Sequence, residues 1–154
     1  MNTEFPKKVA DNVTLFSPDP IVYVVDDFLS HDECQEFINC SQNKLQRATV
    51  VGLDKEQKLD SRTNKFAWLA HDSTEIIHEV SKRLSILVQV PIRNAEMFQV
   101  VHYESGTEYK PHFDSFDRST ELGKKYWEPG GQRMITALIY LNDVEDGGAT
   151  YFPE

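Results

Sequence analysis

The chain has 154 residues, of which 40 % are hydrophobic and 11 % aromatic, so it can form one folded domain with a buried core. Its 25 acidic and 16 basic residues give a net charge of −9 without a basic stripe, which argues against a nucleic-acid partner. The N-terminus lacks the apolar segment of a secretory signal, and no apolar run is long enough to span a membrane. We therefore expect a cytoplasmic protein whose two cysteines, Cys34 and Cys40, are reduced, because they would point to different faces of a helix.

The N-terminal part of the sequence predicts a strand followed by a helix. Residues 1–19 contain scattered prolines and are expected to form an irregular leader. Residues 21–28, IVYVVDDF, are rich in β-branched side chains and predict a strand. The capping-box pattern from Ser30 to Glu33 marks the start of a helix, and apolar side chains at helical spacing extend it over residues 31–44.

The middle of the sequence predicts a second helix after a segment of less regular pattern. Residues 46–70 mix β-branched and polar side chains and are compatible with a hairpin or a long loop. Asp72 or Ser73 is the expected N-cap, because either side chain can accept a hydrogen bond from a free backbone N–H group. The helix should end before Pro91. Its apolar side chains form one stripe, which comprises Ile76, Ile77, Val80, Leu84, Leu87 and Val88.

After the second helix, the apolar pattern changes from helical to strand-like spacing. Strands are predicted at residues 97–103, 109–113, 134–142 and 149–152, and MITALIYLN (134–142) is the strongest of them. Residues 115–131 are polar and predict a long loop, a feature that is often functional in compact domains. Two helices followed by short strands indicate an α+β fold with helices packed on a β-sandwich or jelly roll.

The segment His112-Phe113-Asp114 carries the most informative chemistry in the chain. On a strand, residues i and i+2 face the same side, so an imidazole and a carboxylate would project together while Phe113 points away. Such a pair supplies two ligands of the 2-His-1-carboxylate triad, which holds Fe(II) and leaves coordination positions open. Taken alone, His-x-Asp is more commonly a surface ion pair, so both interpretations stand at this point.

Four segments carry further motifs in a defined order: VVDDFLSHDECQEFI, SRTNKFAWL, QVVHYESGTEYKPHFDSF and GGQRMITALIYLNDVEDGGATYFPE. Together they resemble the prolyl 4-hydroxylase family of 2-oxoglutarate-dependent Fe(II) dioxygenases, with Asn64 in place of a serine of that family. The resemblance implies one domain over residues 20–154, in which N-terminal helices pack on a double-stranded β-helix, or jelly roll. It also implies that His112 and Asp114 are two of the iron ligands.

The resemblance implies roles for four more side chains. Tyr103, in Tyr-x-x-Gly, matches a tyrosine that contacts 2-oxoglutarate, and Thr150, in Gly-Gly-x-Thr, matches a threonine near the distal carboxylate of 2-oxoglutarate. Tyr109 and Arg133 match residues on the peptide side of the pocket. Without the resemblance, these four read as ordinary strand residues and a surface charge. Tyr140 lies on an apolar strand, where core packing is favoured over a place in the cosubstrate pocket.

One feature departs from the family pattern. The family places a second histidine ligand and a lysine or arginine for 2-oxoglutarate well after the Gly-Gly-x-Thr strand, whereas Glu154 follows Thr150 by four residues. We therefore expect an incomplete jelly roll. Two hypotheses account for it: a fragment of a longer enzyme, or a natural short form that is inactive or completed by a partner chain. Under both hypotheses, the polypeptide alone is expected to show no turnover.

The function implied by the resemblance is hydroxylation of a peptidyl proline, coupled to decarboxylation of 2-oxoglutarate to succinate and CO2. The expected cofactors and cosubstrates are Fe(II), 2-oxoglutarate and O2, with ascorbate as an auxiliary reductant, and the expected partner is a peptide or protein that contains proline. Two alternatives remain open: a hydroxylase of another amino-acid side chain or of a free amino acid, and a non-catalytic jelly-roll binding module. The sequence does not indicate an oligomeric state.

Overall fold

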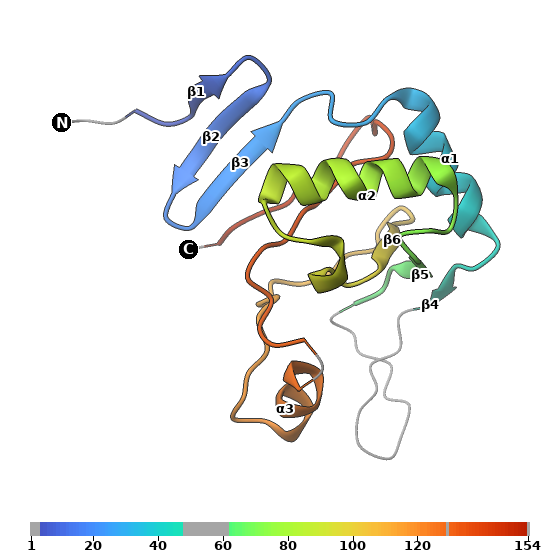
Figure 1. Ribbon diagram of the computed structural model, residues 1–154. Helices are drawn as coiled ribbons and strands as arrows, with labels where there is room; N and C mark the ends of the chain where they lie inside the picture. Colours follow the sequence, from blue (N-terminus) through green and yellow to red (C-terminus); the bar gives the residue numbers. More distant parts are fainter. Residues whose placement is uncertain (1–3, 48–61, 129, 154) are drawn as a thin grey trace.

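The computed structural model describes residues 4–47, 62–128 and 130–153, and within them it shows a mixture of helices and antiparallel sheets (Figure 1). This composition agrees with the expected α+β class, whereas the jelly roll stays a prediction. In chain order the elements are β1 (Lys7–Ala10), β2 (Val13–Pro18), β3 (Ile21–Val25), α1 (His31–Gln42), β4 (Gln46–Arg47), β5 (Lys65–Leu69), α2 (Glu75–Val88), the 3-10 helix η1 (Ile92–Asn94), β6 (Phe98–His102) and α3 (Glu121–Trp127).

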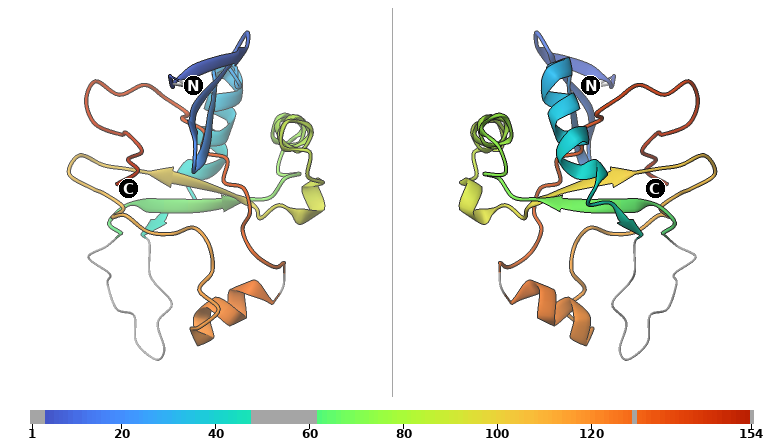
Figure 2. Two further views of the ribbon diagram at one scale, coloured as in Figure 1. Left: turned by 90° about the vertical axis from the view of Figure 1, so that its left-hand side faces the viewer. Right: turned by 90° about the vertical axis from the view of Figure 1, so that its right-hand side faces the viewer.

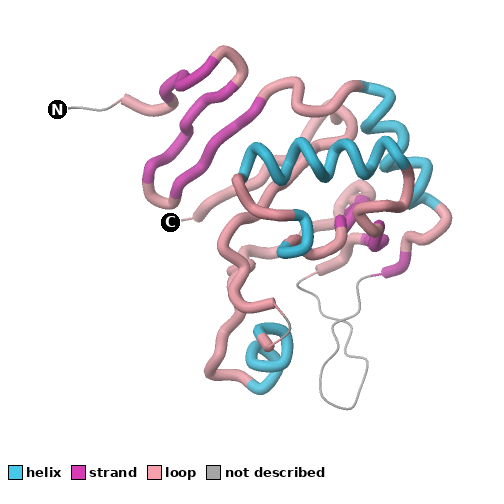
Figure 3. Tube along the Cα trace, in the orientation of Figure 1, coloured by secondary structure: helices cyan, strands magenta, loops and turns pink. Residues whose placement is uncertain are grey.

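The first sheet is an antiparallel meander in the order β1-β2-β3 (Figure 3). The expectation that residues 1–19 are irregular is therefore wrong for residues 7–18. β-Branched and aromatic side chains favour strands there, and the prolines do not interrupt the ladder. Pro18 is the last residue of β2 and Pro20 lies in the turn that follows, positions at which a missing N–H group is tolerated.

The second sheet has the order β4-β5-β6, and the register of β5 with β6 gives it two different faces. Leu69 pairs with Phe98 on one face, and Trp68 pairs with Gln99 on the other. The pairing of β4 with β5 agrees with the hairpin predicted for residues 46–70, although residues 48–61 lie outside the described part of the chain.

Helices α1 and α2 contribute to the hydrophobic core on the Leu69–Phe98 face of this sheet. Figure 2 shows α1 on the opposite side of β5 and β6 from α3. The fully buried core side chains are Phe37, Leu69, Ile77 and Val80. Each contributes about 1.5–3 kcal/mol to folding through the burial of apolar surface. The side chains packed around them are Phe28, Leu29, Cys40, Leu84, Phe98, Val100 and Leu141.

The helix starts follow from local capping. The capping box of α1 is formed, since the Glu33 N–H donates to Ser30 Oγ at 3.3 Å and the Ser30 N–H donates to Glu33 Oε2 at 2.8 Å. The N-cap of α2 is Thr74, so the prediction of Asp72 or Ser73 is wrong. The Ser73 hydroxyl instead donates to the Ala70 carbonyl at 2.8 Å, which leaves the capping position to Thr74.

The apolar stripe of α2 is buried only at its centre. Ile77 and Val80 are fully buried and Leu84 is partly buried, as predicted, whereas Ile76 and Leu87 are 40 % and 46 % exposed. In the described residues, no helix is long and apolar enough to cross a bilayer. Both cysteines on α1 are free thiols, as their spacing predicted.

Three of the predicted strands are not formed. Residues 109–113 contain only an isolated bridge between Tyr109 and Arg62, and neither 134–142 nor 149–152 pairs with any segment that the structure describes. A strand requires a hydrogen-bonded neighbour, and strand propensity alone does not supply one. The apolar side chains of the unpaired segments consequently remain exposed, notably those of Met134, Ile135, Leu138, Tyr140, Tyr151 and Phe152.

The segment 115–131, predicted to be a loop, contains the short helix α3. Thr120 caps this helix by accepting a hydrogen bond from the Gly123 N–H at 2.9 Å. Gly123 lies so close to the preceding turn that an added Cβ would be 1.9 Å from the Asp117 carbonyl oxygen. The helix therefore depends on glycine at this position. Pro129 of the predicted loop lies outside the described residues.

Arg83 of α2 connects the two helices by binding the N-terminus of α1. Its guanidinium donates to both carboxylate oxygens of Glu33, at 2.7 and 3.0 Å, and to the Phe28 carbonyl at 3.0 Å. The hydrogen bond from Arg83 is the largest effect on Glu33 and lowers the pKa of its carboxyl below the usual 4.5, with the Ser30 N–H acting in the same direction. The charged form of Glu33 is therefore favoured by folding.

Glu33→Gln should reduce stability at neutral pH while leaving the capping box intact, because glutamine can also accept the Ser30 N–H. We expect a loss of about 0.5–1 kcal/mol in the free energy of unfolding, since water screens a pair whose arginine is 42 % exposed. The folded-state pKa of Glu33 is lowered, so its contribution is complete above about pH 4.5 and disappears as the pH falls through the folded-state pKa.

Urea unfolding of both proteins between pH 3 and 7 measures this difference, which should shrink at the acidic end. Glu36→Gln, on the same helix, is the matched control, because Glu36 has no arginine partner among the described residues. A constant difference across the pH range would contradict the role of the Arg83–Glu33 pair.

Candidate metal centre

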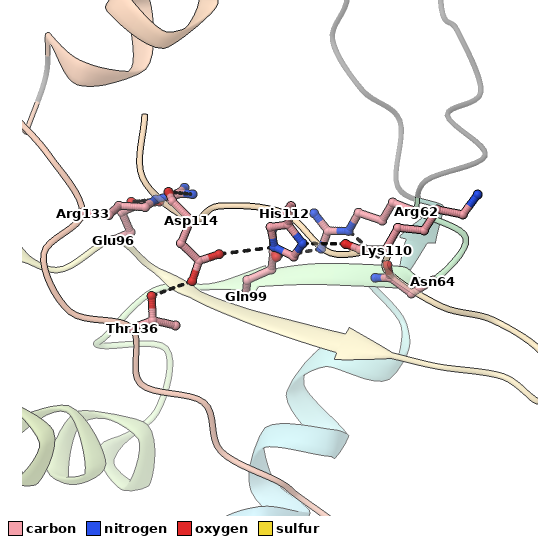
Figure 4. Close-up of polar contacts among 9 residues, drawn as sticks. All are labelled: Arg62, Asn64, Glu96, Gln99, Lys110, His112, Asp114, Arg133 and Thr136. Atoms are coloured by element: carbon pink, nitrogen blue, oxygen red, sulfur yellow. Dashed lines mark hydrogen bonds and ion pairs between the residues drawn. The ribbon is translucent and has the colours of Figure 1, made fainter. Parts of the chain in front are cut away.

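The candidate site lies on the face of β5 and β6 opposite α1, where the chain after β6 passes back over the sheet (Figure 4). Hydrogen bonds between Thr63 and Glu108 hold this returning segment. The Thr63 N–H donates to the Glu108 carbonyl at 3.0 Å, and the Glu108 N–H donates to Thr63 Oγ1 at 2.9 Å. The segment that follows carries Tyr109, His112 and Asp114 and is thereby placed beside the start of β5.

The imidazole of His112 is oriented by two contacts. Its Nδ1 lies 2.8 Å from the Lys110 carbonyl oxygen, which can only accept a hydrogen bond, so Nδ1 carries the proton. Its ring stacks on Tyr109 with a centroid separation of 3.6 Å and an interplanar angle of 17°. In the neutral ring, the lone pair is therefore on Nε2 and points along the ring plane.

Arg62 also contacts the Tyr109 ring of this stack. Its guanidinium carbon lies 4.6 Å from the Tyr109 ring centroid, a cation–π distance. Its Nε donates to Asn64 Oδ1 at 3.0 Å and its Nη2 to Gln99 Oε1 at 2.8 Å. Asn64 is 1 % exposed, and its amide donates to the Lys65 carbonyl at 3.1 Å. A buried amide thus fixes the arginine, which fixes the tyrosine against His112.

The carboxylate of Asp114 has a different partner for each oxygen. Oδ2 accepts a hydrogen bond from the Thr136 hydroxyl at 2.6 Å, and Oδ1 lies 3.3 Å from His112 Nε2. The main-chain carbonyl of Asp114 accepts from Arg133 Nη1 at 3.3 Å. Although residues 112–114 are not part of a regular strand, the two side chains lie on the same side of the chain.

The opposed Nε2 and Oδ1 atoms fit a bound cation. Because Nδ1 holds the proton, Nε2 of the neutral imidazole and Oδ1 of the carboxylate both have lone pairs, and two lone pairs 3.3 Å apart repel unless a positive charge lies between or beside them. A proton or a metal ion supplies that charge. Ligand atoms about 2.1 Å from one metal, at a right angle, are about 3 Å apart, which is close to the observed separation.

Arg133 lies beside Asp114 and is paired with a carboxylate of its own. Its Nε and Nη2 donate to the two oxygens of Glu96 at 2.5 and 2.7 Å. This hydrogen bonding is the largest effect on Arg133 and raises the pKa of its guanidinium. The guanidinium also lies over the Phe116 ring, 4.6 Å from its centroid. Arg133 therefore carries its charge within a neutralised pair on the rim of the site.

The other residues singled out in the sequence lie around the same loop. Burial raises the pKa of the Tyr103 hydroxyl, against the opposing charge of Arg62, so this hydroxyl is a hydrogen-bond donor at neutral pH. The Tyr140 hydroxyl and Thr150 Oγ1 are 2.9 Å apart. Tyr140 is 59 % exposed, so the expectation that it packs in the core is wrong.

No group of three histidine, cysteine or carboxylate side chains is gathered in residues 4–47, 62–128 and 130–153. The His112–Asp114 pair is accordingly a two-residue site within the described chain. The assignment of His112, Asp114, Tyr103, Thr150, Tyr109 and Arg133 to metal, cosubstrate and substrate stays a prediction.

Comparison with known proteins shows what the chain is similar to. Residues 98–154 match the 2OG-Fe(II) oxygenase superfamily model. Probable prolyl 4-hydroxylase 7 from Arabidopsis thaliana is 37 % identical over 143 residues, 92 % of this chain and 44 % of that protein. Prolyl 4-hydroxylase 1 from the same plant is 41 % identical over 138 residues, 87 % of this chain and 47 % of that protein. The chain is therefore similar to prolyl 4-hydroxylases over most of its own length.

The chain spans about half the length of these curated prolyl 4-hydroxylases. The matched superfamily is one of 2-oxoglutarate- and Fe(II)-dependent oxygenases, so Fe(II), 2-oxoglutarate and O2 are the cofactor and cosubstrates that this similarity implies. The donor atoms of the opposed pair, an imidazole nitrogen and a carboxylate oxygen, are those of the facial triad that non-haem Fe(II) oxygenases use. The pair in this prolyl 4-hydroxylase relative is therefore chemically suited to Fe(II).

Sequence reasoning gave no role to several residues that shape the site. Arg62 and Asn64 were recognised only as part of a motif, and Glu96, Gln99 and Thr136 were not singled out. The buried, paired state of Asn64 could have been suspected, because an amide replaces the serine of the family there. The contacts of Gln99 and Thr136 had no signal in the sequence, since their partners are distant along the chain.

Arg62→Met should destabilise the protein by about 1–3 kcal/mol, because the buried Asn64 oxygen loses its donor. Arg62→Lys should cost less than Arg62→Met, since the ammonium retains the charge over Tyr109 without bridging both amides. Denaturant unfolding measures the two free energies. Arg93→Met is the matched control, at an exposed arginine, and should stay within about 0.5 kcal/mol of the wild type. Equal costs for Arg62→Met and Arg93→Met would contradict the role of Arg62.

Proposed function

We propose that this chain carries part of the active site of a 2-oxoglutarate-dependent Fe(II) dioxygenase that hydroxylates peptidyl proline and converts 2-oxoglutarate to succinate and CO2. The observation that carries the proposal is the opposed pair of His112 Nε2 and Asp114 Oδ1, 3.3 Å apart with both lone pairs facing one place. The similarity to prolyl 4-hydroxylases supports the assignment of Fe(II) to this pair.

In the proposed reaction, Fe(II) supplies the oxidative chemistry with 2-oxoglutarate and O2, and ascorbate serves as an auxiliary reductant. His112 and Asp114 would hold the metal from one side, while the Lys110 carbonyl and the Thr136 hydroxyl maintain their orientation. Two ligands from this segment leave the remaining coordination positions for other groups.

We propose that Tyr103 and Thr150 contact 2-oxoglutarate. Both offer hydroxyl groups, which suit the carboxylate oxygens of this cosubstrate. The raised pKa of Tyr103 keeps its proton available for donation, and the hydrogen bond with Tyr140 restricts the rotation of the Thr150 hydroxyl. A polar group that is already restricted before the ligand binds loses less conformational entropy on binding.

The surface around the opposed pair supports a proline-containing peptide as the substrate. Tyr109 contacts both Arg62 and His112, and Arg133 lies over Phe116, so planar aromatic and guanidinium groups lie near the pair. Aromatic-lined surfaces bind proline-rich segments, because the extended polyproline conformation is already restricted before binding. The same surface leaves hydroxylation of another side chain or of a free amino acid as the second candidate.

His112→Ala and Asp114→Ala should each weaken binding of Mn(II), a redox-stable substitute for Fe(II), by about tenfold or more, because one of two ligands is lost. Electron paramagnetic resonance titration of the purified chain measures free Mn(II). His31→Ala, at an exposed histidine of α1, is the control and should leave the affinity unchanged. Unchanged affinity in both site variants would overturn the metal assignment.

Turnover is to be measured on the natural full-length protein, with Fe(II), 2-oxoglutarate, ascorbate and a proline-rich peptide. We expect succinate release together with a peptide mass increase of one oxygen atom, and the loss of both in His112→Ala and Asp114→Ala. Succinate release with hydroxylation only of a free amino acid or of a different side chain would favour the second candidate. A binding module would show neither product, and its affinity for a peptide would survive His112→Ala.

A further inference from the structure

We infer that Thr136 is a positioning residue for the metal-binding carboxylate of Asp114, an inference that rests on the proposed metal site. The Thr136 hydroxyl donates to Asp114 Oδ2 at 2.6 Å, while Asp114 Oδ1 faces His112 Nε2 (Figure 4). The hydrogen bond from Thr136 occupies Oδ2 and leaves Oδ1 on the side of His112.

A carboxylate has two equivalent oxygens and rotates readily about its terminal bond. A hydrogen bond to one oxygen restricts this rotation, because turning the carboxylate plane would break a short, charge-assisted contact. With Oδ2 engaged by Thr136, Oδ1 alone remains available beside Nε2. The arrangement favours monodentate binding through Oδ1 and disfavours a bidentate mode that would occupy a second coordination position.

The backbone around Asp114 is held separately, so the Thr136 contact acts on the side chain. The Phe116 N–H donates to Gln132 Oε1 at 2.7 Å, and Gln132 Nε2 donates to the Phe116 carbonyl at 3.1 Å. Arg133 donates to the Asp114 carbonyl. In the part of the chain that the structure describes, the carboxylate oxygens of Asp114 contact only Thr136 and His112.

Thr136 lies at the surface, where its hydrogen bond adds little to the stability of the fold. Thr136 is exposed, as are residues 134–138 around it, and the hydrogen bond joins two side chains at the surface. A single exposed hydrogen bond contributes little to folding, because water replaces it when it is lost. Its removal should therefore change the geometry and affinity of metal binding while the fold remains the same.

Thr136→Val, which keeps the shape and removes the hydroxyl, should weaken Mn(II) binding about tenfold, the lower end of the range for partners of metal ligands. Thr136→Ser keeps the donor and should restore affinity to within about twofold of the wild type. Thr14→Val, the same change on β2 of the first sheet, is the matched control, because Thr14 is not among the described contacts of the Asp114 carboxylate. Thermal unfolding without metal should have the same midpoint in all four proteins.

A double-mutant cycle of Thr136→Val and Asp114→Ala tests the positioning role of Thr136 separately from the proposed metal site. If Thr136 acts through Asp114, the double variant should bind Mn(II) as weakly as Asp114→Ala alone. The visible spectrum of the Co(II)-loaded chain should also change in Thr136→Val and be restored in Thr136→Ser. If Asp114→Ala weakens binding but Thr136→Val does not, the positioning role is overturned and the metal site stands. If Asp114→Ala itself has no effect, the proposed metal site fails first.

Discussion

The antiparallel register of β5 with β6 is the constraint on which the described site depends. Because side chains alternate along paired strands, this register sends Leu69 and Phe98 into the helical core and turns Gln99 to the opposite face. Gln99 there receives Arg62, and Arg62 supports the stack of Tyr109 on His112. A shift of one residue would exchange the two faces and remove both the core and the support of the site.

The segment that carries His112 and Asp114 is organised by side-chain contacts in place of a β-ladder. The amide of Gln132 binds both the N–H and the carbonyl of Phe116, as a neighbouring strand would. Thr136 and Arg133 add contacts to Asp114. Such contacts fix the direction of the Asp114 side chain while leaving the segment open to solvent.

Local signals explain why the helices and β6 were predictable. The capping box of α1 involves residues three positions apart, and the burial of Ile77 and Val80 follows from their spacing within α2. Strand propensity was less reliable. Residues 134–142 have the strongest strand pattern, but no described segment pairs with them, whereas residues 7–18 form strands because β2 finds neighbours on both sides.

The sequence by itself determined the two helices, since their caps and apolar stripes depend on spacings of a few residues. His112 and Asp114 lie close together without the strand that was expected to align them, so the sequence alone did not account for their placement. Only the tertiary structure decided what holds that pair in place. Arg62 meets Gln99 across 37 positions and Asp114 meets Thr136 across 22. Contacts at such separations depend on sheet register and on how loops return over the sheet, which no local pattern encodes.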